Sequence, residues 1–186
     1  MVLGTLAWVI IAVVALVVIW FIVSYNGFIR LRNRIDNAWS QIDVQLKRRF
    51  DLIPNLINTV KGYMKHEKDT LTEITNARTE FLSANDVKGK AKAENHLAGA
   101  LKTVFAVAEN YPNLKASENF MQLQEELSGT ESKIAYSRQH YNDSVQEYEN
   151  KRETFPSNFI AKLFSFKERE FFRTEGKERE NVQVEF

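Results

Sequence analysis

An unbroken apolar run opens the hydrophobic pattern of this chain, over residues 2–23 (VLGTLAWVIIAVVALVVIWFIV). The run holds 22 residues and no charged side chain. As a helix it would be about 33 Å long, enough to cross a hydrocarbon core of about 30 Å. A secretory signal has a basic start, a shorter apolar core and a small-residue cleavage site, which this segment lacks. A buried core helix usually keeps a few polar positions. We therefore predict a retained transmembrane anchor over residues 1–24.

The residues that follow the apolar run predict its orientation. Arg30, Arg32 and Arg34 lie within 11 residues of its end, and basic residues favour the cytoplasmic side of a membrane. We expect a short amino-terminal tail outside and the rest of the chain in the cytoplasm. Trp20 and Tyr25 are expected in the inner headgroup belt, where amphipathic aromatic rings concentrate. These five side chains are the predicted membrane-interface residues.

After the anchor, apolar or small side chains recur in steps of three and four residues, which predicts one face of a long helix over residues 26–64. The face comprises Phe28, Leu31, Ile35, Ala38, Ile42, Leu46, Phe50, Ile53, Ile57, Val60 and Met64. Pro54 removes one main-chain hydrogen bond and is expected to bend this helix, as a plain bend or as a hinge. Lys47, Arg48 and Arg49 are expected on a polar face, in solvent or in a contact between subunits.

Two more helical patterns follow. The second begins at Thr70–Glu73, which has the spacing of a capping box, lapses over residues 83–89 and ends before Pro112. The third begins after Ser117 and closes at Phe155–Pro156. Its apolar face comprises Phe120, Leu123, Leu127, Ile134, Tyr141, Val145 and Tyr148, with Thr130 and Arg138 at intervening positions.

The three patterns have nearly equal lengths, which predicts an all-α, antiparallel up-and-down bundle of long helices over residues 25–172. Residues 26–64 give 39, residues 117–154 give 38, and the two pieces of the middle pattern sum to 35. The middle rod is expected to be broken near Asn85. If the chain reverses at this loop instead, the bundle has four helices and the third rod ends nearer the membrane.

The segment after Pro156 is rich in phenylalanine (SNFIAKLFSFKEREFF). Phe159, Leu163 and Phe166 are expected to share one helical face. Three interpretations stay open: a short helix that caps the bundle core, a helix on the membrane surface, and a contact between subunits. The remaining residues, 173–186, mix Glu, Lys and Arg and are expected to form a mobile tail.

The candidate chemistry is sparse. The net charge of +1 argues against an electrostatic grip on nucleic acid, and the absence of cysteine excludes disulfides and thiolate zinc sites. His66, His96 and His140 have no metal-ligand spacing, and no nucleotide-binding or hydrolase motif is present. We expect no catalytic, cofactor-binding or metal-binding residues. Glu131 and Arg138, charged side chains at or near the apolar stripe, are expected to pair or to reach solvent, and to form a structural network rather than a catalytic dyad.

Several stretches of the sequence resemble the LemA family: residues 38–49 (AWSQIDVQLKRR), 51–57 (DLIPNLI) and 109–116 (ENYPNLKA), together with the closing Val184-Glu185-Phe186. Glu149 departs from the family, which usually has asparagine at this position, directly after the tyrosine that is Tyr148 here. The resemblance implies a bacterial inner-membrane protein with one anchor and an antiparallel helical bundle. It implies no established activity, although some relatives are associated with membrane shaping and others are encoded beside membrane proteases.

The function that we predict is that of a membrane-anchored, non-enzymatic scaffold that self-associates and organises or shapes the membrane. Trp39, Leu52 and Leu56 lie off the main apolar stripe and need cover from a neighbouring helix or another subunit, which favours a homo-oligomer. Trp39 therefore joins Phe159, Leu163 and Phe166 as a candidate interaction surface. The expected partners are the lipid bilayer, a second copy and another membrane protein, without nucleic acid. The alternatives are an adaptor of a membrane protease or transporter, and a hydrolase with a site between subunits.

Overall fold

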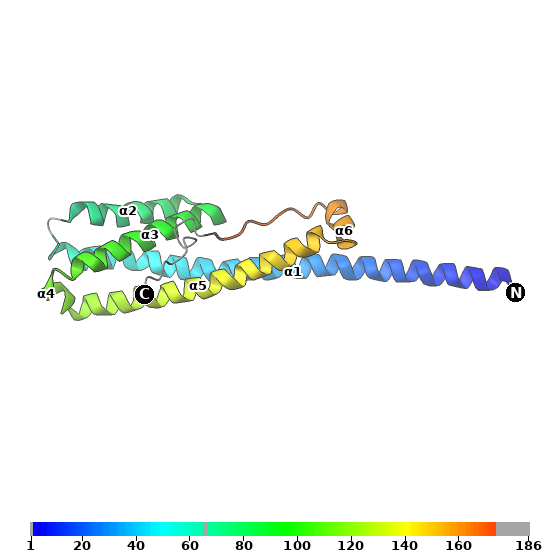
Figure 1. Ribbon diagram of the computed structural model, residues 1–186, viewed down its shortest axis with the longest axis horizontal. Coiled ribbons are helices and arrows are strands. Elements are labelled where there is room, and N and C mark those ends of the chain that lie inside the picture. Colours follow the sequence, from blue (N-terminus) through cyan, green and yellow to red (C-terminus); the bar gives the residue numbers. More distant parts are fainter. Residues whose placement is uncertain (1, 65–66, 174–186) are drawn as a thin grey trace, which may run out of the picture. The chain divides into compact units, whose positions relative to one another are not determined.

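The computed structural model describes residues 2–64 and 67–173, and within these residues every regular element is a helix (Figure 1). The helices are α1 (Val2–Lys61), α2 (Lys68–Ser83), α3 (Val87–Ala108), α4 (Pro112–Lys115), α5 (Glu118–Glu153) and α6 (Ser157–Leu163). The predicted all-α fold class is confirmed. The predicted mobile tail lies, from residue 174 on, outside the described residues.

The chain forms two compact units, and α1 and α5 each contribute to both. We call the described residues up to Trp39, together with His140–Arg169, the anchor unit. Ser40–Gln139 and the described residues from Glu170 on form the bundle unit.

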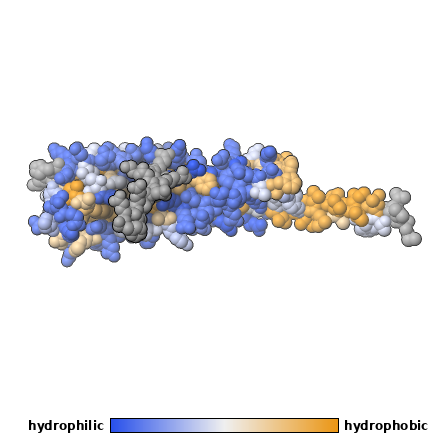
Figure 2. Space-filling model, viewed as in Figure 1, coloured by the Kyte–Doolittle hydropathy of each residue, from blue (hydrophilic) through white to orange (hydrophobic). Residues whose placement is uncertain are grey.

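The apolar run forms the beginning of α1, and from Thr5 to Val23 its side chains are exposed in the isolated chain, apart from the half-buried Phe21. Figure 2 shows this stretch as a predominantly hydrophobic surface. Counted over its described residues, α1 is long and apolar enough to cross a membrane. No break separates this segment from the rest of α1, which also continues through Pro54 to Lys61.

The core of the bundle unit is made by α1, α2, α3 and α5. Its buried apolar side chains include Ile42, Leu46, Phe50, Ile53 and Leu56 of α1, Ile74, Ala77 and Phe81 of α2, Leu97, Leu101 and Val104 of α3, and Leu127 and Ile134 of α5. Phe50 and Phe81 stack face to face with ring centroids 4.0 Å apart. Leu56 is fully buried in place of the predicted Ile57. The buried positions after Phe50 are Ile53 and Leu56, each three residues after the one before it, whereas the predicted stripe advances by four residues from Ile53 to Ile57.

The loop between α2 and α3 reverses the chain. The two helices pack side by side in opposite directions, so the arrangement with four helices is the observed one (Figure 1). Asp86 caps α3 by accepting a hydrogen bond from the Gly89 amide at 2.8 Å. A Cβ at Gly89 would lie 2.6 Å from Asp86 Oδ1, so a larger residue here would have to shift the capping carboxylate.

The predicted capping box at Thr70 is wrong. α2 begins at Lys68, preceded by Glu67, which makes no side-chain cap. Thr70 therefore lies inside the first turn, where its hydroxyl cannot cap the helix. The hydroxyl of Thr72 instead donates to the carbonyl of Lys68.

In the anchor unit, α5 runs antiparallel to α1. Tyr141 packs on Trp39, Glu147 pairs with Arg34, and the Lys151 ammonium lies 5.1 Å from the Phe28 ring centre. Along these contacts the residue numbers rise on α5 while they fall on α1, as expected for two antiparallel helices. The third predicted rod thus ends near the apolar run.

Candidate functional site

A cluster of aromatic rings lies along one face of α1 where the apolar run ends. We call Phe21, Tyr25, Phe28, Phe164 and Phe166 the aromatic collar. The Phe164 ring lies 5.7 Å from that of Phe21 and 4.7 Å from that of Tyr25. The Phe166 ring stacks on Phe28 at 4.6 Å and 19° and lies 5.9 Å from Tyr25. The segment after α6 is thereby fixed against the end of the apolar run.

The turn that ends α6 directs Phe166 into this collar. Ser165 adopts φ 53°, in the left-handed region. Its amide donates to the Lys162 carbonyl at 3.2 Å, and the Phe166 amide donates to the Ala161 carbonyl at 2.9 Å. This pair of bonds is the Schellman arrangement that closes many helices. It takes Phe166 off the helix, so the expectation that Phe166 shares a face with Phe159 and Leu163 is wrong.

The predicted membrane-interface residues lie around the collar. Trp20, Arg30 and Arg32 are exposed, whereas Tyr25 is half-buried beneath Phe164. Arg34 is exposed and pairs with Glu147 of α5. Of the predicted interaction surface, Phe159 and Leu163 are exposed, while Trp39 and Phe166 are partly covered by rings of this same chain.

The bundle unit contains a buried arginine. Arg49 is only 1% exposed and pairs through its guanidinium with Glu94 of α3, which is 6% exposed. Its second terminal nitrogen lies 3.3 Å from a carboxylate oxygen of Glu131 on α5. Two buried atoms, Arg49 Nε and Glu94 Oε2, have no hydrogen-bond partner among the described residues. The three side chains connect α1, α3 and α5 through charge.

Burial sets the protonation of Glu94. Loss of hydration raises its pKa to about 7, against the opposing pull of Arg49. The negative charge of Glu131 adds to the rise, and the positive charge of Arg138 opposes it. Glu94 is therefore close to its titration point near neutral pH.

Sequence reasoning identified only part of this cluster. Glu131 does join a network, and Arg138 acts on it through charge. Arg49 was expected on a polar face, which is wrong: it lies three residues after Leu46 and four before Ile53, within the apolar stripe. Glu94 was missed, although it precedes the buried Leu97 by three residues, a spacing that places it on the core face of α3.

Replacement of Glu94 by Gln should flatten the pH dependence of stability. A carboxyl whose pKa is higher in the folded than in the unfolded chain binds protons on folding, so it makes the protein less stable as pH rises from about 5 to about 8. The shift from 4.5 to about 7 corresponds to roughly 3 kcal/mol. Urea unfolding across this range measures the slope for wild type and Glu94→Gln.

The control for this measurement is Glu125→Gln, at an exposed position of α5. It should leave the slope as in wild type. His96 also contributes to the wild-type slope, because its hydrogen bond to Glu73 raises its pKa and favours the folded state at low pH. Only the difference between Glu94→Gln and wild type is therefore diagnostic, and an unchanged slope would contradict the assignment.

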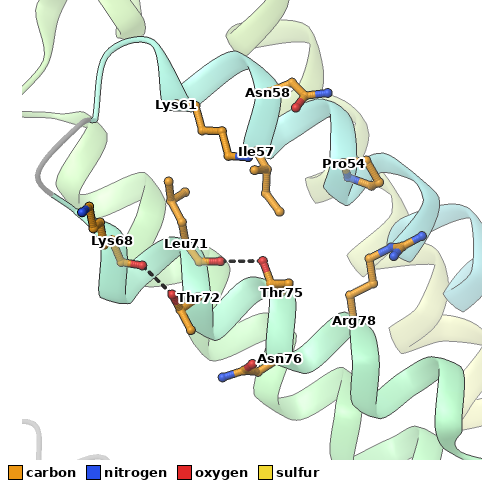
Figure 3. A pocket seen from close by; sticks show the side chains of 10 residues that line it. All are labelled: Pro54, Ile57, Asn58, Lys61, Lys68, Leu71, Thr72, Thr75, Asn76 and Arg78. Atoms are coloured by element: carbon orange, nitrogen blue, oxygen red, sulfur yellow. Dashed lines mark hydrogen bonds between the residues drawn. The ribbon is translucent and has the colours of Figure 1, made fainter.

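A groove of about 590 Å³ lies between α1 and α2 in the bundle unit (Figure 3). Pro54, Ile57 and Leu71 give it an apolar floor, and Lys61, Lys68 and Arg78 add positive charge. The remaining lining residues are Asn58, Thr72, Thr75 and Asn76. This lining is suited to an acidic segment with apolar side chains.

No group of three potential metal ligands occurs in the part of the chain that the structure describes. His96 is held between Glu73 at 2.7 Å and Glu80 at 3.1 Å, and His140 is exposed. His66 lies outside the described residues. The expectation of no metal or cofactor stays a prediction.

A family model and several curated relatives match this chain. The model of the LemA family matches residues 38–186. The chain belongs to the LemA family. This LemA-family chain is 31% identical over 164 residues to Protein LemA of Metamycoplasma hominis, across 86% of the chain and 73% of that relative.

Magnetosome proteins are also among its relatives. The chain is 24% identical over 178 residues to Magnetosome protein MamQ 2 of Paramagnetospirillum magneticum, and 22% identical over 177 residues to Magnetosome protein MamQ of Magnetospirillum gryphiswaldense. These matches cover 82% and 81% of the chain. The chain spans 65% of the length of each MamQ relative, slightly under two thirds.

Proposed function

We propose that this LemA-family chain is a membrane-anchored, non-enzymatic scaffold that self-associates and organises or shapes the membrane. The observation that carries the proposal is the continuity of α1, in which an exposed apolar segment leads into the bundle helices without a linker. The relatives named as magnetosome proteins support a role in organising a membrane compartment. The bilayer is the first partner, and a second copy of the chain is the next.

Self-association is supported by large apolar side chains that remain exposed on the bundle unit. They are Val44, Tyr63, Leu82, Met121 and Tyr136. The cover that Trp39 and Leu56 were expected to need is supplied within the chain, since Trp39 packs on Tyr141 and Leu56 is buried.

The test of self-association is the mass of the full chain in mild detergent, beside a chain that begins at Tyr25. A defined oligomer in both would place the contacts outside the anchor and support the scaffold. An oligomer that is lost with the anchor would assign self-association to the membrane helix. A monomer in both would contradict self-association.

We place the chain in the bacterial cytoplasmic membrane, with a short amino terminus outside and the bundle in the cytoplasm. The exposed Arg30 and Arg32 beyond the apolar run support this orientation. The chain has no cysteine, so Glu125→Cys introduces one reactive thiol on exposed α5. A membrane-impermeant maleimide should label it only after intact cells are opened. Labelling of intact cells would reverse the orientation.

The alternative function is that of an adaptor subunit of a membrane protease or transporter. The groove between α1 and α2 favours it, because its apolar floor and positive charges fit an acidic segment of a partner. A stoichiometric second protein that purifies with wild type but not with Arg78→Glu would favour the adaptor. Lys47→Glu, at an exposed position of α1, is the matched charge control.

Replacement of Trp39 by Ala should loosen either the fold or the assembly. The indole of Trp39 lies 5.7 Å from the Tyr141 ring and is partly exposed, so its loss removes a contact between α1 and α5. We expect a loss of about 1–3 kcal/mol, below that of a fully buried tryptophan. A thermal melt and the detergent mass measure the two effects. If both match wild type, Trp39 anchors neither.

A further inference from the structure

The short helix α6 has two faces of different character. Ile160 and Ala161 are buried against the rest of the anchor unit, whereas Phe159 and Leu163 are 62% and 67% exposed. Phe155, one turn before Phe159, is 73% exposed, and its ring meets that of Phe159 edge to face at 5.9 Å. Large apolar side chains four residues apart thus form one outward row that none of the described residues covers. Such a patch marks an interaction site.

The aromatic collar fixes the depth of this row relative to the apolar run. Phe164 directly follows α6. Its ring contacts Phe21, in the last turn of the apolar run, and Tyr25, two residues beyond the end of the run. Tyr148 donates from its hydroxyl to the Lys167 carbonyl at 2.8 Å, which holds the following segment on α5. α6 therefore lies at the level where α1 would leave the hydrocarbon core, next to its apolar surface (Figure 2).

The charge of the segment fits a lipid surface. Residues 157–167 contain two lysines, Lys162 and Lys167, and no acidic residue. Both lysines are exposed. An apolar row flanked by basic side chains is the pattern of helices that lie in the interface plane and bind anionic lipid. Lysine stems can also bury their methylenes while the ammonium stays among the headgroups.

We propose that α6 and the preceding Phe155 form a second membrane contact, in which Phe155, Phe159 and Leu163 insert into the headgroup and upper acyl region of the leaflet that α1 crosses on its way to the bundle. The inference rests on the proposed membrane anchor. Its consequence is that the chain contacts the bilayer at two adjacent sites: the apolar run of α1, which crosses the membrane, and the exposed apolar row at α6, which lies in the interface.

The test uses the full chain with one cysteine introduced at a time, in vesicles of phosphatidylcholine and phosphatidylglycerol. An environment-sensitive fluorophore is attached at Phe159→Cys or Leu163→Cys, and nitroxide lipids that carry the quencher in the upper acyl chain are added. Leu16→Cys, within the apolar run, is the positive control. Ser132→Cys, exposed on α5 in the bundle unit, is the negative control.

We expect the labels at both α6 positions to be blue-shifted and quenched several-fold more than the label at Ser132. If the Leu16 label is quenched while both α6 labels are not, the inference is overturned and the anchor stands. If the Leu16 label is also unquenched, the proposed anchor fails as well. A blue shift at α6 that needs high protein density and occurs without quenching would assign the row to a second copy and overturn the lipid assignment.

Discussion

Replacement of Arg49 by Met should lower the free energy of unfolding by about 3–5 kcal/mol at pH 8, because it leaves Glu94 buried without its cation. Glu94 is 6% exposed, and its carboxylate pairs with the positively charged guanidinium of Arg49. Methionine fills much of the space of the arginine stem, so packing changes less than charge. Urea unfolding of the full chain in detergent measures the loss.

The control is the neighbouring residue. Arg48 is exposed, and its guanidinium lies 3.8 Å from Glu126, so Arg48→Met should cost about 1 kcal/mol or less. The double variant Arg49→Met/Glu94→Gln should recover part of the loss, because no unpaired charge is then buried. If Arg49→Met is no more harmful than Arg48→Met, the buried pair does not contribute as the geometry indicates.

The pH gives an independent check on the cause. Arg49 lowers the pKa of Glu94, so its removal should raise that pKa beyond about 7. The folded Arg49→Met protein would then hold the Glu94 proton to higher pH than wild type. Its defect should shrink as pH falls toward 5, where Glu94 is protonated and neutral. A defect that is equal at pH 5 and pH 8 would indicate lost packing rather than an unpaired charge.

The helices whose apolar residues recur at regular spacing could be predicted from the sequence. Steps of three and four residues from Phe28 to Met64 predict a helix whatever it packs against, and the buried residues of α1 follow that stripe closely. The apolar run predicts an exposed apolar helix for the same reason. The LemA-family membership was visible in contiguous stretches of sequence, such as residues 38–49.

The features that depend on distant residues could not be predicted. Burial of Arg49 depends on Glu94, 45 positions away along the chain, and no periodicity links the two. Lengths alone could not decide whether the loop at Asn85 breaks a rod or reverses the chain. Phe166 was assigned to a helical face because the turn at Ser165, which stacks Phe166 on Phe28, has no glycine to mark it.

Replacement of Phe28 by Ala should lower the free energy of unfolding by about 3–5 kcal/mol, the range for a buried aromatic side chain. Phe28 is fully buried, stacks on Phe166 and meets the Tyr148 ring edge to face at 6.0 Å. Its loss should also release the segment after α6, since Phe166 loses the ring on which it stacks. Hydrogen exchange at the Arg169 amide, which donates to Glu149 Oε1 at 2.7 Å, reports this release.

Phe50→Ala is the matched control, because Phe50 is equally a stacked core phenylalanine but belongs to the bundle unit. Both variants should be destabilised to a similar degree, but only Phe28→Ala should speed exchange at Arg169 under native conditions. An Arg169 amide that stays protected in Phe28→Ala would mean that Tyr148 and Glu149 hold the segment without the collar. If it is released, the same stacking that stabilises the anchor unit also sets the position of α6, and fluorophores on α6 of Phe28→Ala should lose their fixed depth in the bilayer.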